Sequence, residues 1–157
     1  MSARHVIVLF LLTSMIGAQP LPVYWSKSVT STPVSIGRRA LVIFVVGYTV
    51  DGYYAHCRLS NQSSAAVRVF GVRDSSGDFR AKATLAAAST QHGPWKKVGD
   101  VAPRGHKAAL VVSPYSDSEV IIVDLNELAS LIDKFQYAKI SLPTGEATIF
   151  PIKELKH

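Results

Sequence analysis

Hydrophobic and polar residues follow their clearest pattern in the last third of the chain. Residues 119–124 form a short β-branched run, which is typical of a buried strand. Asp124 is the expected N-cap of a helix over residues 125–135, with Glu127 as its capping-box partner. The apolar side of this three-turn helix is expected to carry Leu125, Leu128, Ala129, Ile132 and Phe135.

The period changes from helical spacing to two after this helix. Residues 137–142 alternate, a turn with Pro143 and Gly145 follows, and residues 147–152 return as the partner strand. The pattern therefore predicts a helix that packs across a sheet and a hairpin that closes it.

A second hairpin is predicted near the start of the chain. The apolar residues 41–50 lead through Asp51 and Gly52, a pair suited to a two-residue hairpin turn, into residues 53–59. The return strand is expected to have two distinct faces, Tyr53, Ala55, Cys57 and Leu59 on one and Tyr54, His56 and Arg58 on the other.

Short strands separated by polar turns are expected through the rest of the chain, at residues 66–72, 79–85, 95–98 and 107–113. Residues 86–88, three alanines, fit either a continuing strand or a helical turn. About nine strands and one C-terminal helix predict a mostly β fold, an antiparallel β-sandwich of the immunoglobulin-like type.

The first 18 residues have the features of a secretory signal peptide. Arg4 and His5 form a basic start, residues 6–16 are apolar, and residues 16–18 end in small side chains. The alternative is a membrane anchor, but these 11 apolar residues would span only about 16 Å of a hydrocarbon core of roughly 30 Å.

We therefore expect residues 1–18 to be cleaved, which implies a secreted or periplasmic protein with no membrane-spanning segment. Residues 19–37 are rich in Ser, Thr and Pro and are expected to form an extended arm with room for one edge strand. Residues 38–157 are expected to form a single β-sandwich domain.

Composition narrows the possible partners. The net charge of +6 falls to +5 when Arg4 is removed, and the basic residues are scattered rather than grouped. This balance favours weak attraction to anionic surfaces such as phospholipid, lipopolysaccharide or acidic glycan. Nucleic acid is not expected as a partner, because the protein is expected to be exported and no motif for reading nucleic acid is present. Cys57 is the sole cysteine, so an intramolecular disulfide is excluded.

Motifs for catalysis, metals and cofactors are absent from the sequence. His56, His92 and His106 have no metal-ligand spacing, and we interpret the first as a sheet-surface residue and the other two as loop residues. Cys57 and His56 should point to opposite faces of a strand, which makes Cys57 a buried, inert thiol rather than a nucleophile. Neither G-x-S-x-G nor S-x-x-K occurs, so the sequence does not indicate a serine nucleophile. No metal and no cofactor are expected.

Cations and an indole gather around two predicted loops and form the candidate binding surface. Its members are His92, Trp95, Lys96, Lys97, Arg104, His106 and Lys107. They would suit an anionic or glycan ligand through charge and stacking. The competing interpretation places Trp95 in the core with the lysines as a solvated rim.

Asn61 and Ser63 match an N-glycosylation acceptor within a predicted turn. The match has a consequence only in a eukaryotic source.

Two stretches resemble periplasmic proteins associated with type VI secretion, the VasI/TagO-like group. Residues 55–61 (AHCRLSN) resemble a strand of that group with its Asn-centred turn, and residues 113–125 (SPYSDSEVIIVDL) resemble its proline-tyrosine turn, strand and helix start. The second cysteine typical of the group near the C-terminus is missing, and the hairpin after residue 137 is additional. The resemblance implies export, a β-sandwich and a role beside a secretion system.

Together these features favour an exported, non-enzymatic interaction module that binds a protein partner or an anionic envelope component. The alternative is a small cell-envelope enzyme acting on glycan or peptide, with a site near His92, Asp100 and His106.

Overall fold

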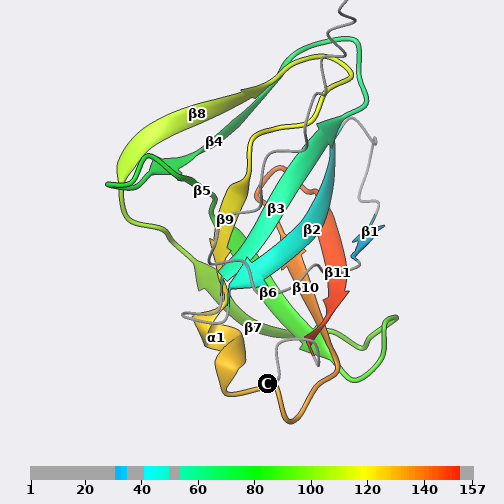
Figure 1. Ribbon diagram of the computed structural model, residues 1–157. Coiled ribbons are helices and arrows are strands. Elements are labelled where there is room, and N and C mark those ends of the chain that lie inside the picture. Colours follow the sequence, from blue (N-terminus) through cyan, green and yellow to red (C-terminus); the bar gives the residue numbers. More distant parts are fainter. Residues whose placement is uncertain (1–30, 35–40, 50–53, 153–157) are drawn as a thin grey trace, which may run out of the picture.

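The computed structural model describes residues 31–34, 41–49 and 54–152, and they form two stacked β-sheets with one short helix, α1 (Asn126–Ala129) (Figure 1). One sheet has five strands, in the order β1 (Thr32–Val34), β11 (Ala147–Pro151), β10 (Tyr137–Ser141), β6 (Ala83–Ala88) and β7 (Lys96–Val101). The other has six, in the order β2 (Leu41–Thr49), β3 (Tyr54–Asn61), β9 (Ile121–Asp124), β5 (Phe79–Arg80), β4 (Val67–Arg73) and β8 (His106–Val112). Apart from the parallel pair of β5 and β9, neighbouring strands are antiparallel.

The predicted mostly β, sandwich-like fold is thereby confirmed. The described residues contain eleven strands where about nine were expected. The immunoglobulin-like arrangement is not confirmed by this strand order.

The core lies between the sheets and is built by alternation along the strands. Ala55, Cys57 and Leu59 of β3 are fully buried, as their shared face predicts. Phe79, which begins β5, and Phe150 of β11 are the largest of the fully buried side chains. Burial of this apolar surface is the dominant stabilising term, since no disulfide is available.

The predicted hairpins are confirmed by their registers. Ile43 of β2 lies opposite Leu59 of β3, although the turn at residues 51–52 lies outside the described residues. Ile140 of β10 lies opposite Thr148 of β11, and the backbone of Leu142 and Glu146 closes that turn with a hydrogen bond of 2.8 Å. Gly145 has a φ of +102°, a conformation that glycine adopts without steric cost.

The segment expected as one strand at residues 79–85 is divided between the sheets. β5 belongs to the six-stranded sheet and β6 to the five-stranded sheet, with the chain crossing at Ala81 and Lys82. The alternation continues through the crossing because both halves bury their apolar side chains in the same interior. Residues 86–88 belong to β6, which resolves their ambiguity in favour of a strand.

The predicted three-turn helix is wrong in length, since α1 has 4 residues. Successive turns follow it, with backbone bonds of 2.9 Å from Leu131 to Leu128 and from Lys134 to Leu131. These three-residue spacings still bury the apolar side chains on one side, which explains the helical pattern. Asp124 is not the N-cap: Leu125 holds that position, and the Asp124 carboxylate accepts a bond of 2.8 Å from the Asn126 backbone.

His56 is also placed differently from the prediction, which put it on the sheet surface. Its side chain is 1% exposed, and its cross-strand neighbour Ile122 is buried as well. Both faces of β3 are therefore covered at this point. Alternation in the sequence separates the two faces of a strand but does not show whether either face is exposed to solvent.

The edge strand expected from the arm is β1, which pairs with β11 at the side of the five-stranded sheet (Figure 1). The predicted signal peptide at residues 1–18 lies outside the described residues. In the ranges that are described, no helix has the length and apolar character needed to cross a bilayer.

Candidate binding surface

The two-stranded ribbon of β4 and β8 carries an exposed apolar face. Phe70 of β4 lies opposite Ala109 of β8, and Arg68 lies opposite Val111. Phe70 is 72% exposed and Val111 is 53% exposed, whereas Leu110, which precedes Val111 on β8, is buried on the inner face. Alternation thus presents a large aromatic side chain to solvent.

A groove of about 870 Å³ runs along this ribbon. Its walls combine apolar and basic groups, chiefly Phe70, Lys82, Pro103, Arg104, Lys107 and Ala109. In the described part of the chain, Lys82, Arg104 and Lys107 take part in no ion pair, and no carboxylate lines the groove. An apolar floor with unneutralised cations suits a ligand that combines an apolar group with negative charge.

Two glycines set the close packing at this groove. A Cβ on Gly71 would lie 2.5 Å from the Arg80 carbonyl oxygen and 2.6 Å from the Phe79 ring. A Cβ on Gly105 would lie 2.3 Å from the Arg73 carbonyl oxygen. The chain that leads into β8 can therefore pass tightly against the end of β4, and this passage puts Arg104 at the end of the groove.

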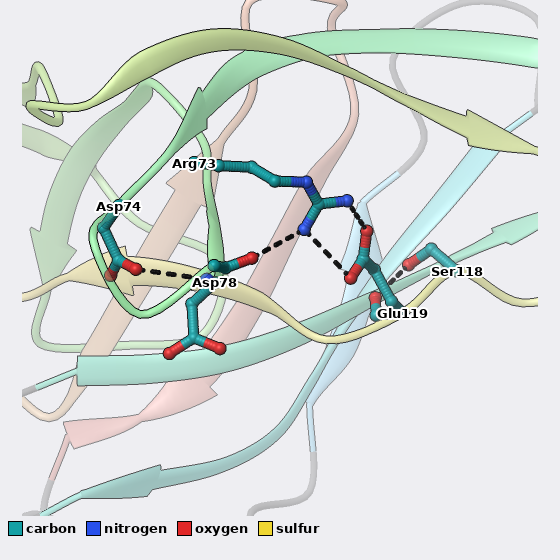
Figure 2. A network of polar contacts seen from close by, with 6 residues as sticks. Arg73, Asp74, Asp78, Ser118 and Glu119 are labelled. Carbon is teal, nitrogen blue, oxygen red and sulfur yellow. Dashed lines mark hydrogen bonds and ion pairs between the residues drawn. The ribbon is translucent and has the colours of Figure 1, made fainter.

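An ion-pair network braces the same end of β4, at Arg73 (Figure 2). The Arg73 guanidinium donates to both carboxylate oxygens of Glu119 and, over 2.8 Å, to the carbonyl oxygen of Gly77. Beside it, Asp74 pairs with Arg80 at 2.6 Å and accepts the Asp78 backbone N–H at 3.1 Å. Hydrogen bonding to Arg80 lowers the pKa of Asp74. The carboxylates of Asp74 and Glu119 thus hold turns and strands together.

The candidate residues identified from the sequence fall into two groups. Arg104 and Lys107 line the groove and the exposed His106 begins β8, while His92 and Trp95 lie beside Lys96 and Lys97 at the start of β7. None of His92, Trp95, Lys96 and Lys97 lines the groove, and the rest of β7, which ends at Val101, lies between them and Arg104 in the chain. The structure therefore does not unite the seven residues in one surface.

Trp95 is half-buried and already in contact with a cation of this chain. The Lys139 ammonium lies 4.8 Å from the centre of its ring, and a Cβ on Gly93 would lie 3.0 Å from the indole. Trp95 is therefore not a core residue, and its ring does not offer both faces for stacking with a ligand, because Lys139 occupies one of them.

A second, polar cleft of about 660 Å³ adjoins the groove, and Arg104 lines both. Its carboxylates are those of Asp74, Asp100, Asp124 and Glu127. Of the three residues expected around an enzymatic site, only Asp100 lines this cleft; His92 and His106 do not. Hydrogen bonding to Lys97, at 2.6 Å, and to Thr84 lowers the pKa of Asp100, which disfavours a role as general acid.

The metal and nucleophile candidates also have clear positions. No group of three or more His, Cys, Asp or Glu residues within the described ranges could hold a metal ion. Burial raises the pKa of Cys57 to about 12, consistent with the inert thiol that the sequence predicts. Burial, together with the nearby Arg80, lowers the pKa of His56 to about 4.

Asn61 is a buried structural residue rather than an accessible glycosylation acceptor. Its carboxamide nitrogen donates to the carbonyl oxygens of Ala65, Val112 and Ser113 at 2.8 to 3.1 Å. Its oxygen accepts from the backbone and hydroxyl of Ser63. With 1% exposure, the side chain has no room for a glycan in the folded protein.

Sequence reasoning missed Phe70, Lys82 and Pro103. Phe70 lies on the same face of β4 as Arg68, which points to solvent. An aromatic residue on a face expected to be exposed was therefore the sequence feature that could have indicated a binding surface. Lys82 and Pro103 lie on separate connections, and their proximity depends on the crossing between the sheets.

The fold and the groove define a two-sheet β-sandwich with a basic, apolar surface on one edge ribbon. Comparisons of the chain with protein-family models, curated proteins and solved structures gave no match.

Proposed function

We propose that this chain is an exported, non-enzymatic interaction module that binds a protein partner or an anionic envelope component through the groove of the β4–β8 ribbon. The observation that carries the proposal is Phe70, which is 72% exposed beside three cations that make no ion pair among the described residues. Aromatic residues and arginine, here Phe70 and Arg104, are enriched at binding interfaces.

Export is part of the proposal and rests on residues 1–18. Their basic start, apolar centre and small final residues support cleavage after Ala18 and a secreted or periplasmic location. N-terminal sequencing of the protein from its native cells tests this, and we expect Gln19 as the first residue. An intact Met1 start in the native protein would contradict export by this route.

The resemblance to the VasI/TagO-like group suggests one setting for such a module, beside a secretion system in the periplasm. The two resembling stretches include Asn61 and the β9 strand, which are structural elements, so they support a shared architecture more than a shared partner. Co-purification with secretion-system components from the native envelope would support this setting.

The binding role is tested by retention of the purified protein on the envelope fraction of its native cells. We expect the wild type and Lys134→Glu, an exposed change after α1 and outside the groove, to be retained equally. Phe70→Ser and Lys107→Glu should each reduce retention by about tenfold, as for interface residues near the centre of a contact. Equal retention of all four proteins would contradict a role for the groove.

The alternative function, an envelope enzyme acting on glycan or peptide, is favoured by the polar cleft with its four carboxylates. Asp124 and Glu127 would be its candidate acid and base, since Asp74 and Asp100 are held in ion pairs. Hydrolysis of cell-wall glycan or peptide that is lost in Glu127→Gln would establish this alternative.

A further inference from the structure

We infer that the occupant of the groove is an extended, acidic polypeptide segment that pairs with β8 as an added strand. This inference rests on the proposed function and specifies the partner of the same groove.

The edge position of β8 provides the backbone part of the interaction. β8 pairs with β4 on one side, and among the described residues no strand pairs with it on the other. Its seven residues, His106–Val112, are long enough to accept a partner strand through main-chain hydrogen bonds.

The register of β8 determines which side chains the partner must carry. Lys107, Ala109 and Val111 face outward, as do their partners Val72, Phe70 and Arg68 on β4. Residues directly opposite one another in a sheet share a face. An added strand therefore places alternate side chains beside Lys107, Ala109 and Val111.

Charge and apolar contact complete the pattern. An acidic side chain fits opposite Lys107, where Arg104 and Lys82 add positive charge, and apolar side chains fit opposite Ala109 and Val111. Phe70 lies on the same face, one strand further away on β4, and extends the apolar surface across Ala109. The expected motif is acid, apolar, apolar at every second position, read forwards in a parallel strand and backwards in an antiparallel strand.

A second copy of this chain fits the groove less well. Its own β8 would bring further cations to a groove that already has three without an ion pair, in a chain of net charge +6. Like charges placed together disfavour such pairing, whereas an acidic segment neutralises the cations.

The test uses the purified full chain and synthetic peptides with glutamate, valine and valine at alternate positions, separated by threonine, in both chain directions. Titrations followed by amide NMR should move the signals of residues 106–112 for at least one direction. Phe70→Ser and Lys107→Glu should each weaken binding by about tenfold, while Lys134→Glu, an exposed change after α1 that does not line the groove, should leave it unchanged. Peptides methylated on alternate backbone nitrogens should bind at least about tenfold more weakly in one of the two methylation patterns, because an added strand needs those N–H groups.

Several results would overturn the inference. The protein could bind both methylated peptides, and a peptide of the same composition with adjacent valines, as tightly as the original peptide. That result would show that charge attraction alone accounts for binding. Binding to phosphatidylglycerol vesicles that depends on Phe70 and Lys107, without peptide binding, would make the ligand a lipid surface and leave the proposed function intact. A concentration-dependent dimer through β8 would make the occupant a second copy. Failure of peptides, vesicles and the envelope fraction to bind would refute both the inference and the proposed function.

Discussion

The side-chain amide of Asn61, at the end of β3, donates a hydrogen bond of 3.0 Å to the backbone carbonyl oxygen of Val112, at the end of β8. This contact joins two strands that are not neighbours in the sheet. The backbone of Asn61 adds a bond of 2.9 Å to the Ser116 carbonyl oxygen. One buried residue thus fixes the far end of the β4–β8 ribbon to the body of the fold.

Replacement of Asn61 by alanine should lower the free energy of unfolding by about 2–4 kcal/mol, because buried carbonyl oxygens lose their donors. Urea unfolding measures this change, with Gln62→Ala, an exposed neighbour, as the control that should shift it by less than about 0.5 kcal/mol. If Asn61→Ala unfolds like the control, the three side-chain bonds do not hold the ribbon in place.

Gly71→Ala should destabilise the protein by about 2 kcal/mol or more, because the new methyl group would meet the Phe79 ring and the Arg80 carbonyl oxygen. Gly99→Ala is the matched control, since a Cβ at this β7 glycine would make an ordinary contact of 3.4 Å with Glu127. Thermal unfolding of the two variants should differ clearly. Equal stability would show that Phe79 does not pack beneath the ribbon.

The buried His56 predicts a pH-dependent stability. Its pKa is lowered to about 4 in the folded protein from an ordinary value of 6.5, so the unfolded state takes up a proton first as the pH falls. Stability is therefore complete above about pH 6.5 and declines by up to about 3 kcal/mol as the pH falls to about 4. Asp74 and Asp100, whose pKa values are lowered, lose their contribution only at still lower pH.

Urea unfolding across this pH window measures the slope. His56→Gln should flatten it, whereas His92→Gln, at an exposed position, should not. An unchanged slope in His56→Gln would place the titrating group elsewhere.

Cys57 should remain unlabelled by a thiol reagent in the native protein and react fully once denaturant is added. Full burial and a pKa raised to about 12 leave almost no thiolate and no access at neutral pH. Absorbance of the released thiol dye follows the reaction. Rapid labelling without denaturant would contradict the packing of β3 against the core.

Trp95 should show partial exposure in a Trp25→Phe variant, with acrylamide quenching between that of a buried and a free indole. Removing the cation above its ring by Lys139→Gln should increase the quenching and lower stability by about 0.5–1 kcal/mol. Lys96→Gln serves as the control. A blue-shifted and unquenched Trp95 would exclude any role for it in binding.

The fold could be predicted from alternation wherever one face of a strand is buried and the other is not. This holds for the β10–β11 hairpin and for Ala55, Cys57 and Leu59. It fails at His56, where both faces are covered, and at the crossing near Ala81, where both sheets bury the same side of the chain. The short α1 was overestimated because turns with three-residue spacing bury the same apolar positions as a helix.

The candidate surface was only half predictable for a related reason. Arg104 and Lys107 are close in sequence, so their charge was visible as a cluster. Phe70 and Lys82 reach the same groove only through the pairing of β4 with β8 and the change of sheet after β5. Proximity of this kind depends on strand order, which alternation does not determine.

Hydrogen exchange of the purified chain, with and without the envelope fraction of its native cells, tests the central claim most directly. If the protein binds through the groove, β4, β8 and residues 102–105 of the wild type should exchange more slowly when the envelope fraction is present. The Lys107→Glu variant with the envelope fraction should keep the exchange pattern of the free protein. Protection confined to β7 around Trp95, or no change in β4 and β8 while the protein is bound, would contradict it.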